Sequence, residues 1–117
     1  MDFWASWCPP CLAELPHLQE LQERVEKRGM KVVLVNVDLE NTQAVGRFLQ
    51  RKGIHLDSLL DRDSVLFQAL GLDALPSTFV LDARGRPVAF FQGGMGREEL
   101  ELVLLRANEK RVRNTYR

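Results

Sequence analysis

One stretch near the start of the chain decides the fold: residues 2–11 read Asp2-Phe3-Trp4-Ala5-Ser6-Trp7-Cys8-Pro9-Pro10-Cys11. The short aromatic segment 3–5 is typical of the end of a buried strand, and residues 6 and 7 predict a turn. Proline is tolerated in the first turn of a helix, where its missing N–H would have no partner, so Pro9 and Pro10 predict a helix start. We therefore expect the two cysteines at a junction of strand and helix.

The position of this cysteine pair favours thiol–disulfide exchange. A sulfur at the N-terminus of a helix lies beside unpaired N–H groups and the positive end of the helix dipole, which stabilise a thiolate. The thiolate is the attacking species in disulfide exchange, and a second sulfur one turn away can close the ring and release the product. The pattern predicts that Cys8 is the nucleophile and Cys11 the resolving thiol.

Three other uses of the two cysteines are weaker. A structural zinc site needs four ligands, and His17 and His55 are the histidines that remain to supply two of them. A c-type haem attachment requires a histidine directly after the second cysteine, where this chain has Leu12. A purely structural pair stays open as a third alternative.

The rest of the chain alternates between strand and helix patterns. Apolar residues recur at helical spacing after Cys11; Gly29 predicts the end of that helix, and Pro16 predicts a kink in it. Residues 32–35 are apolar on both faces, which predicts a buried parallel strand within 31–37. Further segments predict helices at 42–52, 65–70 and 97–111. They also predict strands at 58–60, 78–81 and 88–91, and the last two strands are joined by the turn 82–86.

Asp63 and Ser64 are expected to cap the short helix at 65–70. The order predicts an α/β fold, a sheet covered by helices.

The composition is that of a soluble globular domain with its own core. The 117 residues are 45% apolar and 27% charged, which suits one domain over 1–117 and argues against disorder. Sixteen basic and sixteen acidic residues give a formal net charge of zero, so we expect no nucleic-acid partner. The sequence contains no run of about 18 apolar residues and no visible signal segment. With two cysteines, it is not a disulfide scaffold.

Two motifs resemble those of a known family. Residues 2–11 resemble the active-site strand and helix of thioredoxin-like proteins, and the continuation Cys11-Leu12-Ala13-Glu14-Leu15-Pro16 resembles more specifically the TlpA/ResA/DsbE group of bacterial thiol–disulfide reductases. The stretch 71–82, which contains Leu75-Pro76-Ser77-Thr78, resembles the cis-proline loop of that group. About 38 residues separate Asp38 from Pro76, and the extra helix and strand in this interval are similar to the group's central insert.

The resemblance implies a thioredoxin-like fold, with a central mixed sheet flanked by helices and a TlpA-type central insert. It also implies that the Leu75–Pro76 bond is cis and that these residues line the substrate groove, where the main chain of Leu75 could pair with an extended client. From the residues alone, Pro76 could equally be no more than the marker of a strand start. Glu14 would be an acid near the cysteines that influences their ionisation, or alternatively a first-turn residue that favours the helix dipole. Asp2 matches the position of the buried acid of thioredoxin, where the TlpA/ResA/DsbE group more often has an uncharged residue. A buried carboxylate there would have a raised pKa and could relay a proton to Cys11.

The aromatic and proline residues around the cysteines complete the expected site. Trp4 is expected in the core, and Trp7 beside the groove. The expected substrate-binding residues are Trp7, Pro9, Pro10, Leu75 and Pro76.

The function implied by the resemblance is reduction of protein disulfides, as in cytochrome c maturation or as a general reductant outside the cytoplasm. The expected partners are protein thiols and disulfides and an upstream thiol reductant protein, and no metal or organic cofactor is needed. An oxidase or isomerase on the same scaffold stays open, as does a non-enzymatic binding module or truncated remnant. A peroxiredoxin-type peroxidase is disfavoured because the Pro and Thr that precede its reactive cysteine are absent.

The chain differs from this family at its N-terminal end. The family's fold has a further strand before Asp2, and its active-site strand is longer on that side. A short strand in the middle of a sheet is a template for pairing with another chain. We therefore expect either a monomer or a strand-swapped dimer.

Overall fold

The chain folds around a mixed five-stranded sheet, and the computed structural model describes residues 1–93 and 97–115. The strands are β1 (Asp2–Trp4), β2 (Val33–Asn36), β3 (Asp57–Leu60), β4 (Ser77–Leu81) and β5 (Pro87–Gln92). Their order is β3-β2-β1-β4-β5, with β1, β2 and β3 parallel and β4 antiparallel to both of its neighbours. The segment that contains the cysteines therefore leaves the central strand of the sheet.

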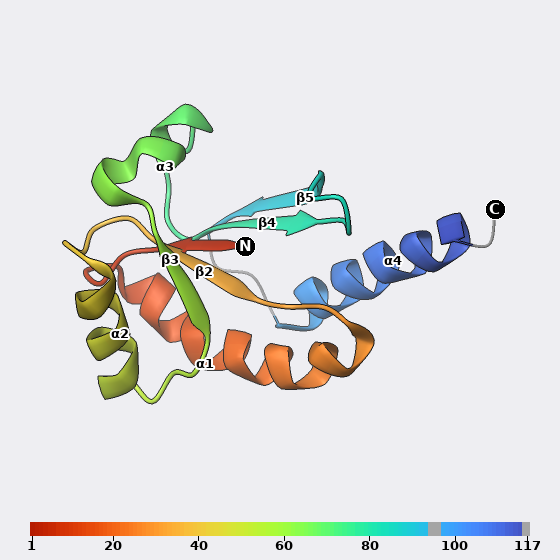
Figure 1. Ribbon diagram of the computed structural model, residues 1–117, viewed down its shortest axis with the longest axis horizontal. Coiled ribbons are helices and arrows are strands. Elements are labelled where there is room, and N and C mark those ends of the chain that lie inside the picture. Colours follow the sequence, from red (N-terminus) through yellow and green to blue (C-terminus); the bar gives the residue numbers. More distant parts are fainter. Residues whose placement is uncertain (94–96, 116–117) are drawn as a thin grey trace.

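The helices cover the two faces of this sheet unequally. They are α1 (Pro9–Val25), α2 (Thr42–Arg51), α3 (Val65–Ala69) and α4 (Arg97–Thr115), with short 3₁₀ turns at Glu26–Arg28 and Arg62–Ser64. Figure 1 shows α1, α2 and α4 on one side of the sheet and α3 on the other. Parallel strands joined by right-handed crossovers that advance in one direction place α1 and α2 on the same face. The predicted α/β fold with a helix-flanked mixed sheet is confirmed; none of the described helices is long and apolar enough to cross a membrane.

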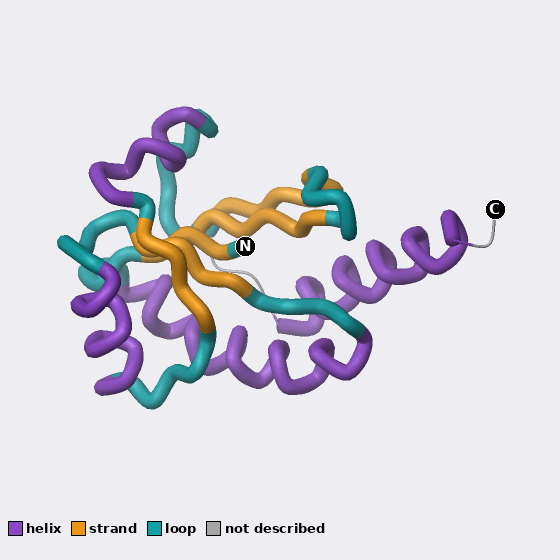
Figure 2. The backbone as a smooth tube through the Cα atoms, viewed as in Figure 1, coloured by secondary structure: helices purple, strands orange, loops and turns teal. Residues whose placement is uncertain are grey.

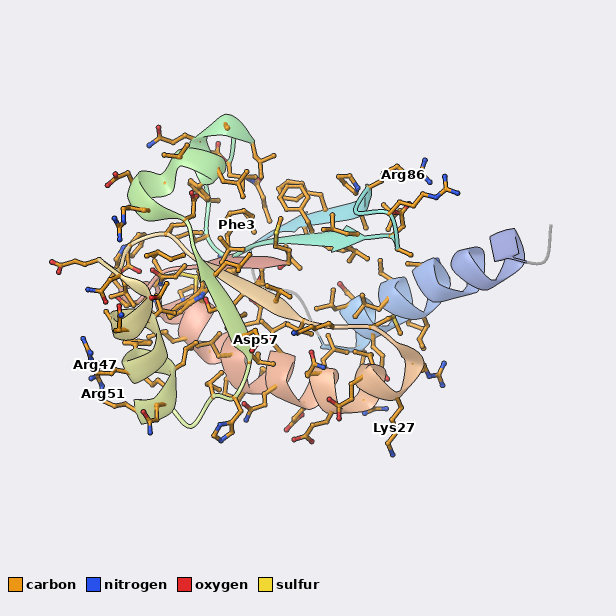
Figure 3. The ribbon with its side chains drawn as sticks, in the orientation of Figure 1. Phe3, Lys27, Arg47, Arg51, Asp57 and Arg86 are labelled. Carbon is orange, nitrogen blue, oxygen red and sulfur yellow. A yellow bond between two sulfur atoms is a disulfide. The ribbon has the colours of Figure 1, made fainter. Side chains whose placement is uncertain are left out.

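Apolar side chains pack on both faces of the sheet. On the face of α1, α2 and α4, the buried side chains include Trp4, Leu34 and Val80 from the strands and Leu15 from α1. On the opposite face Phe3 is buried, and its ring lies 6.0 Å from that of Phe67 in α3 and 6.2 Å from that of Phe79, centroid to centroid. Figure 3 labels Phe3 between the sheet and α3. The central strand is thus covered on both sides, which makes it the most buried part of the sheet.

The expected cap of α3 is wrong. Asp63 and Ser64 have positive φ angles of 58° and 55°, and neither has the extended conformation that an N-cap residue needs. The carboxylate of Asp61 replaces them: it accepts hydrogen bonds from the N–H groups of Leu66 and Phe67, both at 2.8 Å. The 3₁₀ turn before α3 places the carboxylate of Asp61 next to the free N–H groups of α3. The side chains of Asp63 and Ser64, which directly precede the helix, do not cap it.

The central strand is short, as the sequence predicts. Residues of β1 pair with β2 on one side and with β4 on the other. β2 begins at Val33, opposite Met1, whereas β4 continues past this position to Leu81. Figure 2 shows this end of the chain between two longer strands. A cavity of about 410 Å³ lies beyond it, lined by Met1, Met30, Val33, Leu81 and Leu104 among others.

Candidate active site

Cys8 and Cys11 form a disulfide at the start of α1, with their Cα atoms 5.3 Å apart. Cys8 is the N-cap residue: its backbone is extended, and its sulfur accepts a hydrogen bond from the N–H of Cys11 at 3.3 Å. Pro9 and Pro10 occupy the first two helical positions, as predicted. Cys8 is 3% exposed and Cys11 is fully buried, so the sulfur at the helix terminus is also the one nearer to solvent. This geometry fits Cys8 as the attacking thiolate and Cys11 as the resolving thiol.

A hydrogen-bond network that the sequence analysis missed holds the turn before Cys8. Asp38 accepts a hydrogen bond from the N–H of Ser6 at 2.9 Å, and its second oxygen accepts one from the Ser6 hydroxyl. The buried amide of Asn36 donates to Asp38 at 2.9 Å, and its carbonyl accepts from the N–H of Asp38 at 3.1 Å. The network fixes the loop that presents Trp7 and Cys8. Its sequence signal is the pair Asn36 and Asp38 at the end of a parallel strand, next to the strand that leads into the cysteine-containing turn.

The proline loop lies at the same edge of the sheet as the disulfide. Phe3 pairs with Ser77 in antiparallel register, so the end of β1 and the start of β4 coincide. The Leu75–Pro76 bond is cis, and Pro76 is fully buried. Gly93 donates to the carbonyl of Pro76 at 2.8 Å, whereas the main chain of Leu75 makes no backbone hydrogen bond within the described residues. That the N–H and C=O of Leu75 pair with a bound client stays a prediction.

Asp2 is a buried acid, as the resemblance implies. It is 1% exposed; one carboxylate oxygen accepts a hydrogen bond from the Thr78 hydroxyl at 2.5 Å, and the other makes no hydrogen bond within the described residues. Burial raises the pKa of Asp2 to about 6, and the Thr78 hydrogen bond and the charge of the chain's amino group limit this rise. A carboxyl with such a pKa can exchange protons near neutral pH. Its action on Cys11 stays a prediction.

Glu14 lies close to the cysteines along α1, but not in the first turn. It is the sixth residue of the helix, and the first turn contains no acidic residue. The alternative role as a first-turn acid on the helix dipole is therefore wrong. Glu14 is 6% exposed and follows Cys11 by three positions, which places it on the same side of α1. Its predicted effect on cysteine ionisation is compatible with this place.

The two tryptophans near the disulfide have different environments. Trp4 is fully buried, packs against Phe48 with centroids 5.4 Å apart, and donates from its indole nitrogen to the Ser58 hydroxyl at 3.2 Å. Trp7 is 67% exposed and lines a cavity of about 250 Å³ with Leu75. The larger cavity beyond β1 contains none of the expected site residues in its lining. The smaller one, through Trp7 and Leu75, lies next to the redox site.

The described residues contain no group of three His, Cys, Asp or Glu side chains that could hold a metal ion. His17 and His55, which a zinc site would need, are both exposed, one on α1 and the other between α2 and β3. They do not converge on the cysteine pair in a metal-binding arrangement.

Comparisons with known proteins agree with this geometry. The Redoxin family profile matches residues 1–104. The thiol-disulfide oxidoreductase ResA of Geobacillus thermodenitrificans is 33% identical over 101 residues, which are 86% of this chain and 58% of that protein. The chain thus spans little more than half the length of that relative.

Two solved structures have the same fold. A Chlorobium tepidum protein described as a thiol:disulfide interchange protein DsbE superposes with a TM-score of 0.82 at 29% identity, over 92% of this chain and 77% of that one. StoA from Bacillus subtilis superposes with a TM-score of 0.73 at 30% identity, over 86% of this chain and 76% of the other. With the cysteine pair at the helix start and the cis-proline loop beside it, these matches show that the chain belongs to the redoxin family and is a thioredoxin-like protein of the TlpA/ResA/DsbE type.

Proposed function

We propose that this chain is a thiol–disulfide oxidoreductase that reduces protein disulfides through Cys8 and Cys11. The observation that carries the proposal is the disulfide at the N-terminus of α1, in which the sulfur of Cys8 accepts an N–H of the first helical turn. Such a position favours the thiolate form of the reduced enzyme.

The reaction begins when the Cys8 thiolate attacks one sulfur of a client disulfide. A mixed disulfide forms between Cys8 and the client, and the other client sulfur leaves as a thiolate. Cys11 then loses its proton and attacks the sulfur of Cys8, which releases the second client thiol and forms the Cys8–Cys11 disulfide. Two electrons pass from the enzyme dithiol to the client disulfide, and an upstream thiol protein restores the dithiol.

Four other residues would support this exchange. Asp2, with its pKa near 6, would accept the proton of Cys11, and Glu14 would influence cysteine ionisation from the next turn of α1. The free main-chain groups of Leu75 would pair with an extended client strand, and Pro76 would form the floor beside them. The clients are thus proteins or peptides with exposed disulfides, and the resemblance favours work outside the cytoplasm, including cytochrome c maturation.

Single-cysteine variants test the assignment of roles. Cys11→Ser should accumulate a mixed disulfide with a disulfide-bonded client, because nothing then resolves it, whereas Cys8→Ser should not. Mass spectrometry of the trapped adduct gives the readout. Accumulation in the Cys8→Ser variant instead would reverse the two roles.

The direction of electron flow has a separate test. Trp7 adjoins Cys8, so its fluorescence should follow the redox state of the pair in a series of glutathione buffers. A two-electron transition at a strongly reducing potential supports a reductant. A transition at an oxidising potential would make the chain an oxidase or isomerase, and a folded protein without a transition would make it a binding module.

A further inference from the structure

The cavity beside Trp7 has apolar walls from three separate parts of the chain. Trp7 comes from the turn before the disulfide, Val37 from the end of β2, Phe67 from α3 and Leu75 from the proline loop. The volume of about 250 Å³ has room for one side chain of a bound peptide. Because Trp7 precedes Cys8 and Leu75 precedes Pro76, a client bound at the disulfide would place a residue next to its reactive cysteine in this cavity.

The walls of the cavity are held in place before any client binds. Asp61 holds the start of α3 through the N–H groups of Leu66 and Phe67, and its own N–H donates to the carbonyl of Asn36 at 2.7 Å. On the other side, Ser77 donates from its hydroxyl to the carbonyl of Ala74 at 2.6 Å. A preformed pocket loses less conformational entropy on binding than a mobile one.

The charge around the cavity is acidic. Asp38 and Asp73 both line it, and no Lys, Arg or His is among the described lining residues. Asp38 is held by Ser6 and Asn36. Asp73 is exposed; its Oδ1 accepts from the side chain of Gln92 at 3.0 Å, while its Oδ2 has no partner within the described residues. Two carboxylate side chains and no basic one among the described lining residues favour a cation at the rim.

We propose that this cavity selects clients, binding an apolar side chain adjacent to the client's reactive cysteine together with a Lys or Arg that pairs with Asp73. The inference rests on the proposed function and adds a substrate class to it. Asp73 is the specificity residue because it is the exposed acid of the rim, whereas Asp38 contributes charge but already has its hydrogen bonds inside the protein. A client with Glu in place of the Lys or Arg meets a like charge, and like charges across an interface disfavour the wrong partner.

Short peptides with one cysteine activated as a mixed disulfide with thionitrobenzoate provide the test. Attack of reduced Cys8 on the peptide sulfur releases coloured thionitrobenzoate and forms a mixed disulfide with the peptide, which Cys11 then resolves. Four peptides combine Leu or Ser beside the cysteine with Arg or Glu at the next position. Each rate is divided by the rate of the same peptide with glutathione, which removes the effect of peptide charge on intrinsic reactivity.

We expect the Leu–Arg peptide to react fastest. Exposed charge pairs contribute modestly, so replacing Arg by Glu should slow the reaction about fivefold, and about 0.5 M salt should remove most of this preference. The variant Asp73→Asn should reduce the Arg-over-Glu ratio to about twofold, with the Leu-over-Ser preference retained. Asp57→Asn, an exposed carboxylate on β3 outside this cavity, is the matched control and should leave both ratios unchanged.

The outcomes separate the two proposals. Equal normalised rates for the four peptides, or an Arg-over-Glu ratio that Asp73→Asn does not change, would overturn the client selection while leaving the redox function intact. Release from none of the peptides by a folded, reduced enzyme would overturn the proposed function itself.

Discussion

Replacement of Asp2 by Asn should remove a pH-dependent loss of stability from this protein. Asp2 is buried in the central strand, and burial raises its pKa from 3.8 to about 6. The folded state therefore binds the proton more tightly than the unfolded chain does. The stabilisation from the protonated carboxyl is fully present below pH 3.8 and is lost as the pH rises through about 6.

The size of this loss follows from the difference between the two pKa values. One pKa unit corresponds to about 1.36 kcal/mol, so the interval from 3.8 to about 6 gives about 3 kcal/mol. Asn keeps an oxygen that can accept the hydrogen bond of Thr78, but it carries no charge to desolvate. Because the unfolded carboxyl is already partly deprotonated at pH 4, the wild-type protein should lose about 2–3 kcal/mol of unfolding free energy between pH 4 and pH 8, relative to the Asp2→Asn variant.

Urea unfolding of the oxidised protein at several pH values between 4 and 8 measures this difference. Asp57→Asn makes the same chemical change at an exposed carboxyl of β3, which pairs with Lys31, and is the control for the substitution itself. Parallel profiles for wild type and Asp2→Asn would refute the reasoning, because they would mean that Asp2 titrates alike in the folded and unfolded chains.

Two further predictions concern the framework of the site. Asp61→Ala should destabilise the protein by about 1–2 kcal/mol, because two N–H groups of α3 lose their acceptor. Hydrogen exchange at the amides of Leu66 and Phe67 should accelerate, and unchanged exchange there would contradict the capping role of Asp61. Leu15→Ala should cost about 3 kcal/mol of unfolding free energy, because the Leu15 side chain of α1 is buried in the core. The same change at the 57% exposed Leu102 should cost well under 1 kcal/mol, and equal costs in chemical denaturation would argue against the described packing of α1.

Local sequence rules predict most of the elements. Pro9 and Pro10 mark the start of α1 because the first helical N–H groups need no partner, and Gly29 ends the turn that follows α1 with a positive φ of 77°. The predicted strand at 31–37 is shorter in the structure, as β2 (Val33–Asn36), because only these residues pair with β3, and residues 34–36 of them also pair with β1. The helix runs through Pro16 over Pro9–Val25, and the kink at this residue stays a prediction.

The site is predictable to the extent that its parts lie together in the sequence. Cys8, Cys11 and their helix start form one continuous segment, so the redox centre can be found without a structure. The cap of α3 could not be found in this way, since Asp61 precedes the helix by an irregular turn whose positive φ angles have no local pattern.

What the sequence by itself determines is the chemistry: a cysteine pair at a helix N-terminus and a proline that leads into a strand. What only the tertiary structure decides is the environment of these groups. The contact of Asp2 with Thr78 spans 76 positions, and that of Ser6 with Asp38 spans 32. Such contacts depend on which strands become neighbours, here β1 with β4 on one side and β2 on the other. Burial and pKa follow from this arrangement in space, because desolvation depends on everything that surrounds a group and not on the residues beside it in the chain.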